Sequence, residues 1–316
     1  MPDTFFTASP HWEWFIILYF FVGGIAGGSF ILAALLDFFG RPADRALVRL
    51  GYYVALGGVA VSGILLTADL PRPERFWHML IESNTGRPMF KAWSPMSVGV
   101  WGVSGFGLFA FLASLGAVVE AGVFRWRVLG WAPIRALAAR GPALAIAGVG
   151  SLFGFLLAGY TGVLLAVSNR PIWADSSFLG LLFLVSAAST AAACLILLGI
   201  WRKVASPTAL DQLARFDRGA MGLELVALVL FLGSLGPAAR LLFGWWGLLL
   251  VVGVVGAGIL VPLAMERRGR KAEAEPGHRR LAQASALVLL GGLLLRVVVI
   301  LSSNGTHVIG SGVSSR

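Results

Sequence analysis

Residues 14–38 read WFIILYFFVGGIAGGSFILAALLDF, and this stretch decides the fold class. It is longer than the roughly 20 apolar residues that an α-helix needs to cross the hydrocarbon core of a bilayer. Further apolar runs follow at 47–68, 95–118, 143–166, 177–201, 219–236, 241–265 and 281–300. The sequence therefore predicts an all-α integral membrane protein with eight transmembrane helices.

The composition of the chain agrees with this class. Its 316 residues are 58% hydrophobic and only 13% charged, and the mean hydropathy is +0.84. Soluble domains carry about 25% charged residues. A transmembrane β-barrel would show alternating segments of about ten residues, which this sequence lacks.

The net charge of +10 is explained by membrane topology, so no nucleic-acid partner is expected. With eight helices, the loops on one side hold 17 Lys and Arg residues and those on the other side hold 7, while Arg296 lies inside the last span. Lys and Arg concentrate in cytoplasmic loops. We therefore expect a multi-pass protein of the bacterial inner membrane with both termini outside, in the periplasm. The most basic loop, 266–280, is expected to touch anionic membrane lipid.

The order of the spans divides the chain into two halves of four helices, although no internal sequence repeat relates them. The predicted parts are an outer N-terminal segment 1–13, a first four-helix bundle 14–166 with an outer loop 67–95, a second four-helix bundle 167–300 and an outer tail 301–316. The N-terminal segment lacks Lys and Arg, so we do not expect a cleavable signal peptide there.

Several cofactors and activities are excluded by counting residues. Cys194 is the single cysteine, which rules out an internal disulfide, a four-cysteine zinc site and a cysteine-ligated iron–sulfur cluster. A membrane haem usually takes axial histidines from facing helices, and none of the four histidines lies in the middle of a span. Neither a G-x-x-x-x-G-K-[ST] loop nor an H-E-x-x-H motif is present. We therefore expect no metal in this protein.

Ionisable residues crowd the outer loop 67–95. They are Asp69, Arg72, Glu74, Arg75, His78, Glu82, Arg87 and Lys91. Ionisable groups at membrane depth are costly, so they are candidates for function. The predicted topology also brings Tyr19, Asp69, the segment 91–97 and the segment 160–169 to one membrane level.

Each of these candidates has a second, structural interpretation. Tyr19 lies four residues before Gly23, on the face of small residues that helices use to approach closely, but it could be an interfacial aromatic residue. Asp69 could exchange protons, or it could be a helix-end carboxylate paired with Arg72 or Arg75. His78 could donate a hydrogen bond, or it could belong to the interfacial belt beside Trp77.

Four ordered motifs resemble the NrfD/PsrC family of membrane subunits of polysulfide-reductase-type complexes. They are YFFVGGIAGGSF, DLPRPERFWHML, FKAWSPMSVGVWG and GYTGVLLAVSNRPIW, within residues 12–175. The second half of the sequence matches the family only in hydropathy and helix count.

The resemblance implies two four-helix bundles, no haem or iron–sulfur cluster in this protein, and a site for quinone or quinol (menaquinone or ubiquinone) at the outer face. It implies a ferredoxin-like [4Fe–4S] subunit docked on the outer loops, usually beside a molybdopterin catalytic subunit. The protein would then act as the quinone-reactive subunit of an oxidoreductase complex and would not be active alone.

The resemblance also assigns roles to residues. Tyr160 falls on a family tyrosine that bonds a quinone oxygen, and Asp69 matches a family acid. Tyr19 and Ile16 stand where some relatives carry a histidine and an asparagine, so the pose of the quinone is expected to differ. The remaining residues that we expect to contact the quinone are Gly23, His78, Trp93 and Ser94.

Two phenolic hydroxyls and a carboxylate suit quinol chemistry, with Tyr19 and Tyr160 as hydrogen-bond donors and Asp69 as the base. A path for protons could use Asp37, Glu120, Glu224 and Arg296. Two alternatives stay open. Charged groups and Gly- or Pro-interrupted helices are also typical of secondary transporters, and the outer loop 67–95 could make the protein a passive anchor for partner subunits.

Overall fold

The computed structural model describes residues 12, 14–122, 131–168, 170, 172–271 and 278–303, and these form an all-helical protein. The long helices are α1 (Trp14–Phe39), α2 (Arg45–Ala68), α3 (Pro95–Ala121), α5 (Arg140–Ala166), α6 (Leu179–Trp201), α7 (Pro207–Ser234) and α10 (His278–Ser302). Between α7 and α10, a further span joins α8 (Trp245–Leu248), a π-helical segment (Leu249–Leu260) and α9 (Val261–Lys271). Shorter helices are 3-10 turns at Pro42–Asp44, Pro73–Met79 and Gly236–Leu242, and α4 (Ala132–Ala136).

Seven helices in the described ranges are long and apolar enough to cross a membrane. The number rises to eight if α7 and the 3-10 turn Gly236–Leu242 that follows it, bent by 112°, form one span. The prediction of an all-α integral membrane protein is therefore confirmed, whereas eight spans require this bent pair to be counted as one.

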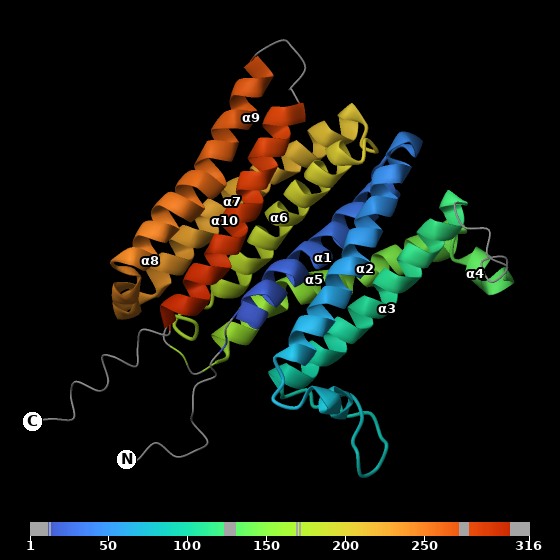
Figure 1. The fold of residues 1–316 in the computed structure, drawn as a ribbon, viewed down its shortest axis with the longest axis horizontal. Coiled ribbons are helices and arrows are strands. Elements are labelled where there is room, and N and C mark those ends of the chain that lie inside the picture. Colours follow the sequence, from blue (N-terminus) through green and yellow to red (C-terminus); the bar gives the residue numbers. More distant parts are fainter. Residues whose placement is uncertain are drawn as a thin grey trace, which may run out of the picture.

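The helices lie side by side and run in alternating directions (Figure 1). Helix α1 is central, because it packs on α2, α5 and α6. We call the end of the molecule where α1 begins and α2 ends the site end. The opposite end, where α1 ends and both α2 and α5 begin with arginine, is the basic end. The predicted segments 1–13 and 301–316 fall mostly outside the described residues.

Small residues allow α1 to pack this closely. A Cβ atom built on Gly27 would lie 2.6 Å from the carbonyl oxygen of Gly154 in α5. One built on Gly28 would lie 2.6 Å from the Cβ of Ala191 in α6. The two glycines therefore allow close contact with two different helices, α5 and α6, as expected for small residues that bring membrane helices together.

Helix α7 begins at Pro207, well before the predicted start at residue 219. Ser206 caps it by accepting a hydrogen bond from the backbone N–H of Ala209, and Pro207 occupies the first turn, where proline is favoured. The prediction was wrong because the early turns are too polar for a hydropathy window. Asp217 therefore lies inside the helix and not at its start, and the hydroxyl of Ser189 in α6 donates to its carboxylate over 2.6 Å.

Candidate functional site

A cavity of about 790 Å³ lies at the site end, and we call it the site cavity. Its walls come from α1, α2, the 3-10 turn Pro73–Met79, α3 and α5. Most of its lining side chains are apolar, among them Ile16, Ile64, Leu66, Phe76, Met79, Leu80, Met96, Val100, Val103 and Leu164. This volume falls in the range of about 300–1,000 Å³ that is typical of small-molecule sites.

Tyr160 reaches the site cavity from α5. Its side chain is buried, and its hydroxyl donates a hydrogen bond to the backbone carbonyl of Pro95, at the start of α3. Proline occupies the first turn of α3. Gly99, one turn further, makes room for the phenol ring, since a Cβ atom there would lie 2.5 Å from the Tyr160 hydroxyl oxygen. The position of Tyr160 therefore depends on α3.

Tyr19 reaches the same cavity from α1 and is 2% exposed. Ile16, about one turn earlier in α1, also lines the cavity and contributes an apolar side chain to its wall. Gly23, one turn later, is not part of the lining. A Cβ atom on Gly23 would meet Ser62 of α2 and the Tyr19 ring, each at 3.4 Å.

Asp69 lies at the C-cap of α2, where its backbone N–H continues the helix by bonding the carbonyl of Leu65. The residue is exposed and also lines the site cavity. Asp69 therefore stands where the apolar cavity meets the polar surface beyond the helix end. A carboxylate in this position can exchange protons with water.

The structure thus brings Tyr19, Asp69 and Tyr160 to one cavity, whereas the other four predicted contacts, Gly23, His78, Trp93 and Ser94, lie outside its lining. His78 packs edge-on against Trp77, with 3.9 Å between the ring centroids. Trp93 is 81% exposed. Ser94 caps α3 by accepting a hydrogen bond from the backbone N–H of Ser97.

The sequence did not reveal Trp12 as a wall of the site cavity. Its ring stacks on Trp173, with 5.4 Å between centroids. Trp173 is fully buried and donates from its indole nitrogen to the carbonyl oxygen of Val299 in α10. Arg170 lies over the same ring at 5.2 Å, and burial lowers the pKa of this guanidinium. Trp173 therefore connects α10 to the cavity wall. In the sequence, only the motif NRPIW pointed to this connection.

The four residues of the expected proton path fall into two separate groups. Asp37 and Glu120 lie at the basic end, next to arginines of α2. Glu224 and Arg296 lie inside the protein, where the Ser186 hydroxyl contacts both. The Arg296 side chain also donates to the carbonyl oxygens of Phe20 in α1 and Gly292 in α10.

Comparisons with known proteins agree on one family. The family model described as "Polysulphide reductase, NrfD" matches residues 3–307. The sequence is 27% identical to Protein NrfD of Escherichia coli over 313 residues, spanning 92% of this protein and 93% of that one. It is also 27% identical to a polypeptide of the polysulfide reductase of Wolinella succinogenes, spanning 80% of this protein and 82% of that one.

A shorter match is 28% identical to a selenate reductase polypeptide of Mesobacillus selenatarsenatis, over 24% of this protein and 18% of that one. The two long matches extend well beyond the first four helices, to which the sequence motifs were confined. The protein therefore belongs to the NrfD/polysulfide reductase family of helical membrane proteins.

Proposed function

We propose that this protein is the membrane subunit of a multi-subunit oxidoreductase, that it binds quinone or quinol at the site end, and that electrons pass between this quinone and an iron–sulfur partner. The observation that carries the proposal is the site cavity, an apolar slot into which Tyr19 and Tyr160 reach while Asp69 lies where it meets the surface.

A bound quinol would supply two electrons and two protons when it is oxidised. The protein's own residues hold the ring and handle the protons. Because the Tyr160 hydroxyl donates to Pro95, its oxygen is available as an acceptor, which suits a quinol hydroxyl. Tyr19 offers a second hydroxyl from another helix, and Asp69 takes up a released proton and passes it to water.

The outer loop 67–95 is the proposed docking surface for a ferredoxin-like [4Fe–4S] subunit. Four aromatic side chains of this loop are exposed beyond the helix ends: Phe76, Trp77, Phe90 and Trp93. Aromatic residues are enriched at protein interfaces. The relatives from polysulfide reductase and selenate reductase support a complex with further subunits, of which we expect a molybdopterin protein to be the catalytic one.

The proposed topology follows the charges. The site end faces the periplasm of a bacterial inner membrane and the basic end faces the cytoplasm, because loops at the basic end carry most of the Lys and Arg residues. In this arrangement α1, α2, α3 and α5 form the bundle that holds the site, and the remaining spans, which include α6, α7 and α10, form a second bundle that packs against α1 and α5.

The test begins with the protein purified from its own membranes in mild detergent. We expect an iron-rich partner to accompany it and a quinone analogue to bind with micromolar affinity. Because the Tyr160 oxygen acts as an acceptor, the Tyr160→Phe variant should bind an analogue that carries a quinol-type hydroxyl roughly three- to tenfold more weakly, since one hydrogen bond is lost from an otherwise unchanged ring. Fluorescence quenching of the bound analogue measures both affinities.

Tyr52→Phe is the matched control, because this substitution also removes one tyrosine hydroxyl, but at the basic end, far from the site cavity. Equal affinity of wild type and Tyr160→Phe would remove Tyr160 from the site. An iron-free preparation that binds no analogue would contradict the proposal and favour a secondary transporter. An iron-rich complex without analogue binding would favour a passive anchor.

Proton translocation is a second proposed activity, favoured by the buried ionisable groups of α7. Glu224 and Asp217 are both buried, and one carboxylate oxygen of Asp217 has no hydrogen-bond partner among the described residues. Ionisable groups inside a membrane protein often serve proton relays. A path through α7 would connect the interior near Arg296 to the basic end.

Glu224→Gln is expected to lower the number of protons moved per electron while quinol turnover continues, since glutamine keeps the shape but cannot carry a proton. The measurement is acidification in proteoliposomes containing the complex. Asp211→Asn is the matched control, because Asp211 is an exposed carboxylate of the same helix, paired with Arg215. An unchanged proton yield in Glu224→Gln would exclude Glu224 from any path.

A further inference from the structure

A second, smaller cavity lies at the basic end, between α1, α2, α3, α5 and residues 137–138, which follow α4. Its volume is about 110 Å³. The site cavity, which we propose as the quinone site, lies at the opposite ends of the same long helices. Charged and polar side chains line much of it: Asp37, Arg45, Arg49, Tyr52, Glu120 and Arg140. The arrangement therefore differs in chemistry from the apolar site cavity.

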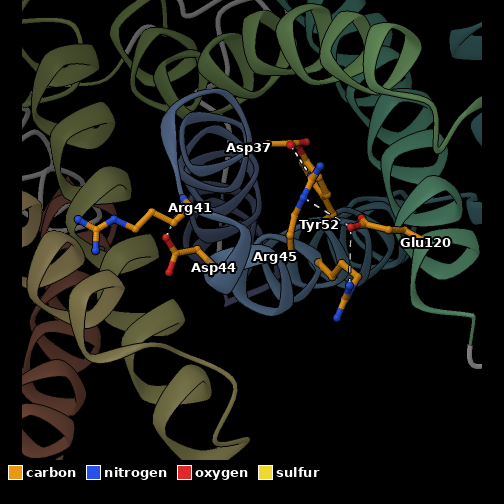
Figure 2. Close-up of polar contacts among 7 residues, drawn as sticks. Asp37, Arg41, Asp44, Arg45, Tyr52 and Glu120 are labelled. Atoms are coloured by element: carbon orange, nitrogen blue, oxygen red, sulfur yellow. Dashed lines mark hydrogen bonds and ion pairs between the residues drawn. The ribbon is translucent and has the colours of Figure 1, made fainter.

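Ion pairs hold the arginines of α2 in place around this cavity (Figure 2). Arg45 donates to Asp37 over 2.6 Å and lies 3.5 Å from Glu120. Arg49 lies 3.8 Å from the same oxygen of Glu120. The Tyr52 hydroxyl donates to the second carboxylate oxygen of Asp37 over 3.3 Å. These contacts link α1, α2 and α3 and fix two guanidinium groups at the cavity wall.

The ion pairs do not neutralise all of the positive charge that lines this cavity. Three arginines face two carboxylates in the lining, and Arg140 forms no ion pair with any residue in the described part of the chain. Each guanidinium has five N–H donors in a planar fork. The ion pairs engage only one or two donors of Arg45 and one of Arg49.

Arg140 is also the first residue of α5, a helix of 27 residues. A positive side chain at a helix N-terminus is unfavourable by itself, because the helix dipole is positive there. Arg140, the N-terminus of α5 and the spare donors of Arg45 and Arg49 all lie at one cavity. All of these groups favour a negatively charged ligand, and an anion with several oxygen atoms can accept hydrogen bonds from more than one of them.

We propose that the basic-end cavity binds a phosphate oxyanion, supplied by the headgroup of an anionic phospholipid. The cavity volume of about 110 Å³ suits a group as small as a phosphate. A water molecule takes about 30 Å³ in the liquid, so the cavity has room for only a few waters or for one small anion. All six polar lining residues lie within a few turns of a helix end, which is where headgroups meet a membrane protein. Inorganic phosphate has the same oxyanion and is the alternative source.

The experiment uses the full-length protein with its co-purified partners in a neutral detergent, and the readout is the midpoint of thermal unfolding. Ligands that bind only the folded state raise this midpoint. The probes are dioctanoyl-phosphatidylglycerol, dioctanoyl-phosphatidylcholine and sodium phosphate. We expect a saturable rise with phosphatidylglycerol and a much smaller one with phosphatidylcholine, whose headgroup carries no net charge.

Arg140→Gln should need about tenfold more phosphatidylglycerol for the same rise, because it removes the Arg140 guanidinium and the hydrogen bonds that we expect it to donate to the ligand. Arg140→Lys keeps the positive charge but lacks the planar guanidinium. The phosphatidylglycerol concentration that it needs should therefore lie between those of the wild type and of Arg140→Gln. Arg135→Gln is the matched control, because Arg135 is an exposed arginine of α4 that does not line the cavity. If Arg140→Gln does not fold, Arg140→Lys carries the comparison.

A saturable effect of sodium phosphate with the same dependence on Arg140 would support the oxyanion site and identify free phosphate as the source. Two results would overturn the proposal. One is equal stabilisation by phosphatidylglycerol and phosphatidylcholine. The other is the same lipid response in the Arg140 and Arg135 variants. Neither result bears on the quinone site, which is tested separately.

Discussion

Replacing Asp69 by asparagine is expected to slow quinol turnover by about 10²- to 10⁴-fold, the usual loss when a general base is removed. Asparagine has the same shape and can keep the backbone cap of α2, so the purified complex should assemble normally. The variant loses the ability to take a proton where the cavity meets the surface. The measurement is quinol oxidation or quinone reduction by the purified complex with an artificial electron partner.

Glu74→Gln is the control for Asp69→Asn. Glu74 belongs to the 3-10 turn Pro73–Met79 that forms one wall, but its exposed side chain does not line the cavity. Its neutralisation should leave turnover unchanged. If Asp69→Asn keeps the wild-type rate while analogue binding also stays intact, the proton leaves the cavity by another group, and Asp69 is a helix-end carboxylate without a chemical role.

Replacing Gly27 by valine is expected to have the largest effect on folding. The added Cβ atom would lie 2.6 Å from the carbonyl oxygen of Gly154, so α1 and α5 would have to move apart. Overpacking typically costs about 1–3 kcal/mol and occasionally more. We expect the upper end of this range, about 3 kcal/mol or more, because the obstacle is backbone rather than a flexible side chain.

The amount of monodisperse protein extracted from membranes and its thermal midpoint measure this effect. Gly57→Val is the control, since a Cβ atom on Gly57 of α2 meets nothing within 4 Å. Any fraction of Gly27→Val that folds should also bind the quinone analogue weakly, because α1 and α5 carry Tyr19 and Tyr160. Equal stability of the two valine variants would contradict the close contact of α1 with α5.

The helices could be predicted from the sequence because membrane insertion depends on a local quantity, the hydropathy of about 20 successive residues. The prediction failed at α7, where Asp211, Arg215, Asp217 and Arg218 make the early turns polar. Asp211 pairs with Arg215 one turn later in the same helix, whereas Glu266 of α9, which pairs with Arg218, and Ser189 of α6, which donates to Asp217, lie beside α7 only in the folded protein. A hydropathy window cannot contain such partners.

The candidate site was partly predictable for a similar reason. Topology fixes the depth of each residue, so Tyr19, Asp69 and Tyr160 could be expected at one level, although not at one cavity. The contact of Gly99 with the Tyr160 ring could not be predicted, and neither could the stacking of Trp12 on Trp173. Both depend on how neighbouring helices are rotated about their own axes.

The sequence alone determined that this is a helical membrane protein, which end of its helices gathers the tyrosines and the carboxylate, and which family its motifs resemble. Only the tertiary structure decided that these side chains share one apolar cavity and that Arg45 and Arg49 hold Asp37 and Glu120 at the cavity that Arg140 also lines. Hydropathy and charge act along one helix at a time, whereas a cavity arises from packing between helices that are distant in sequence.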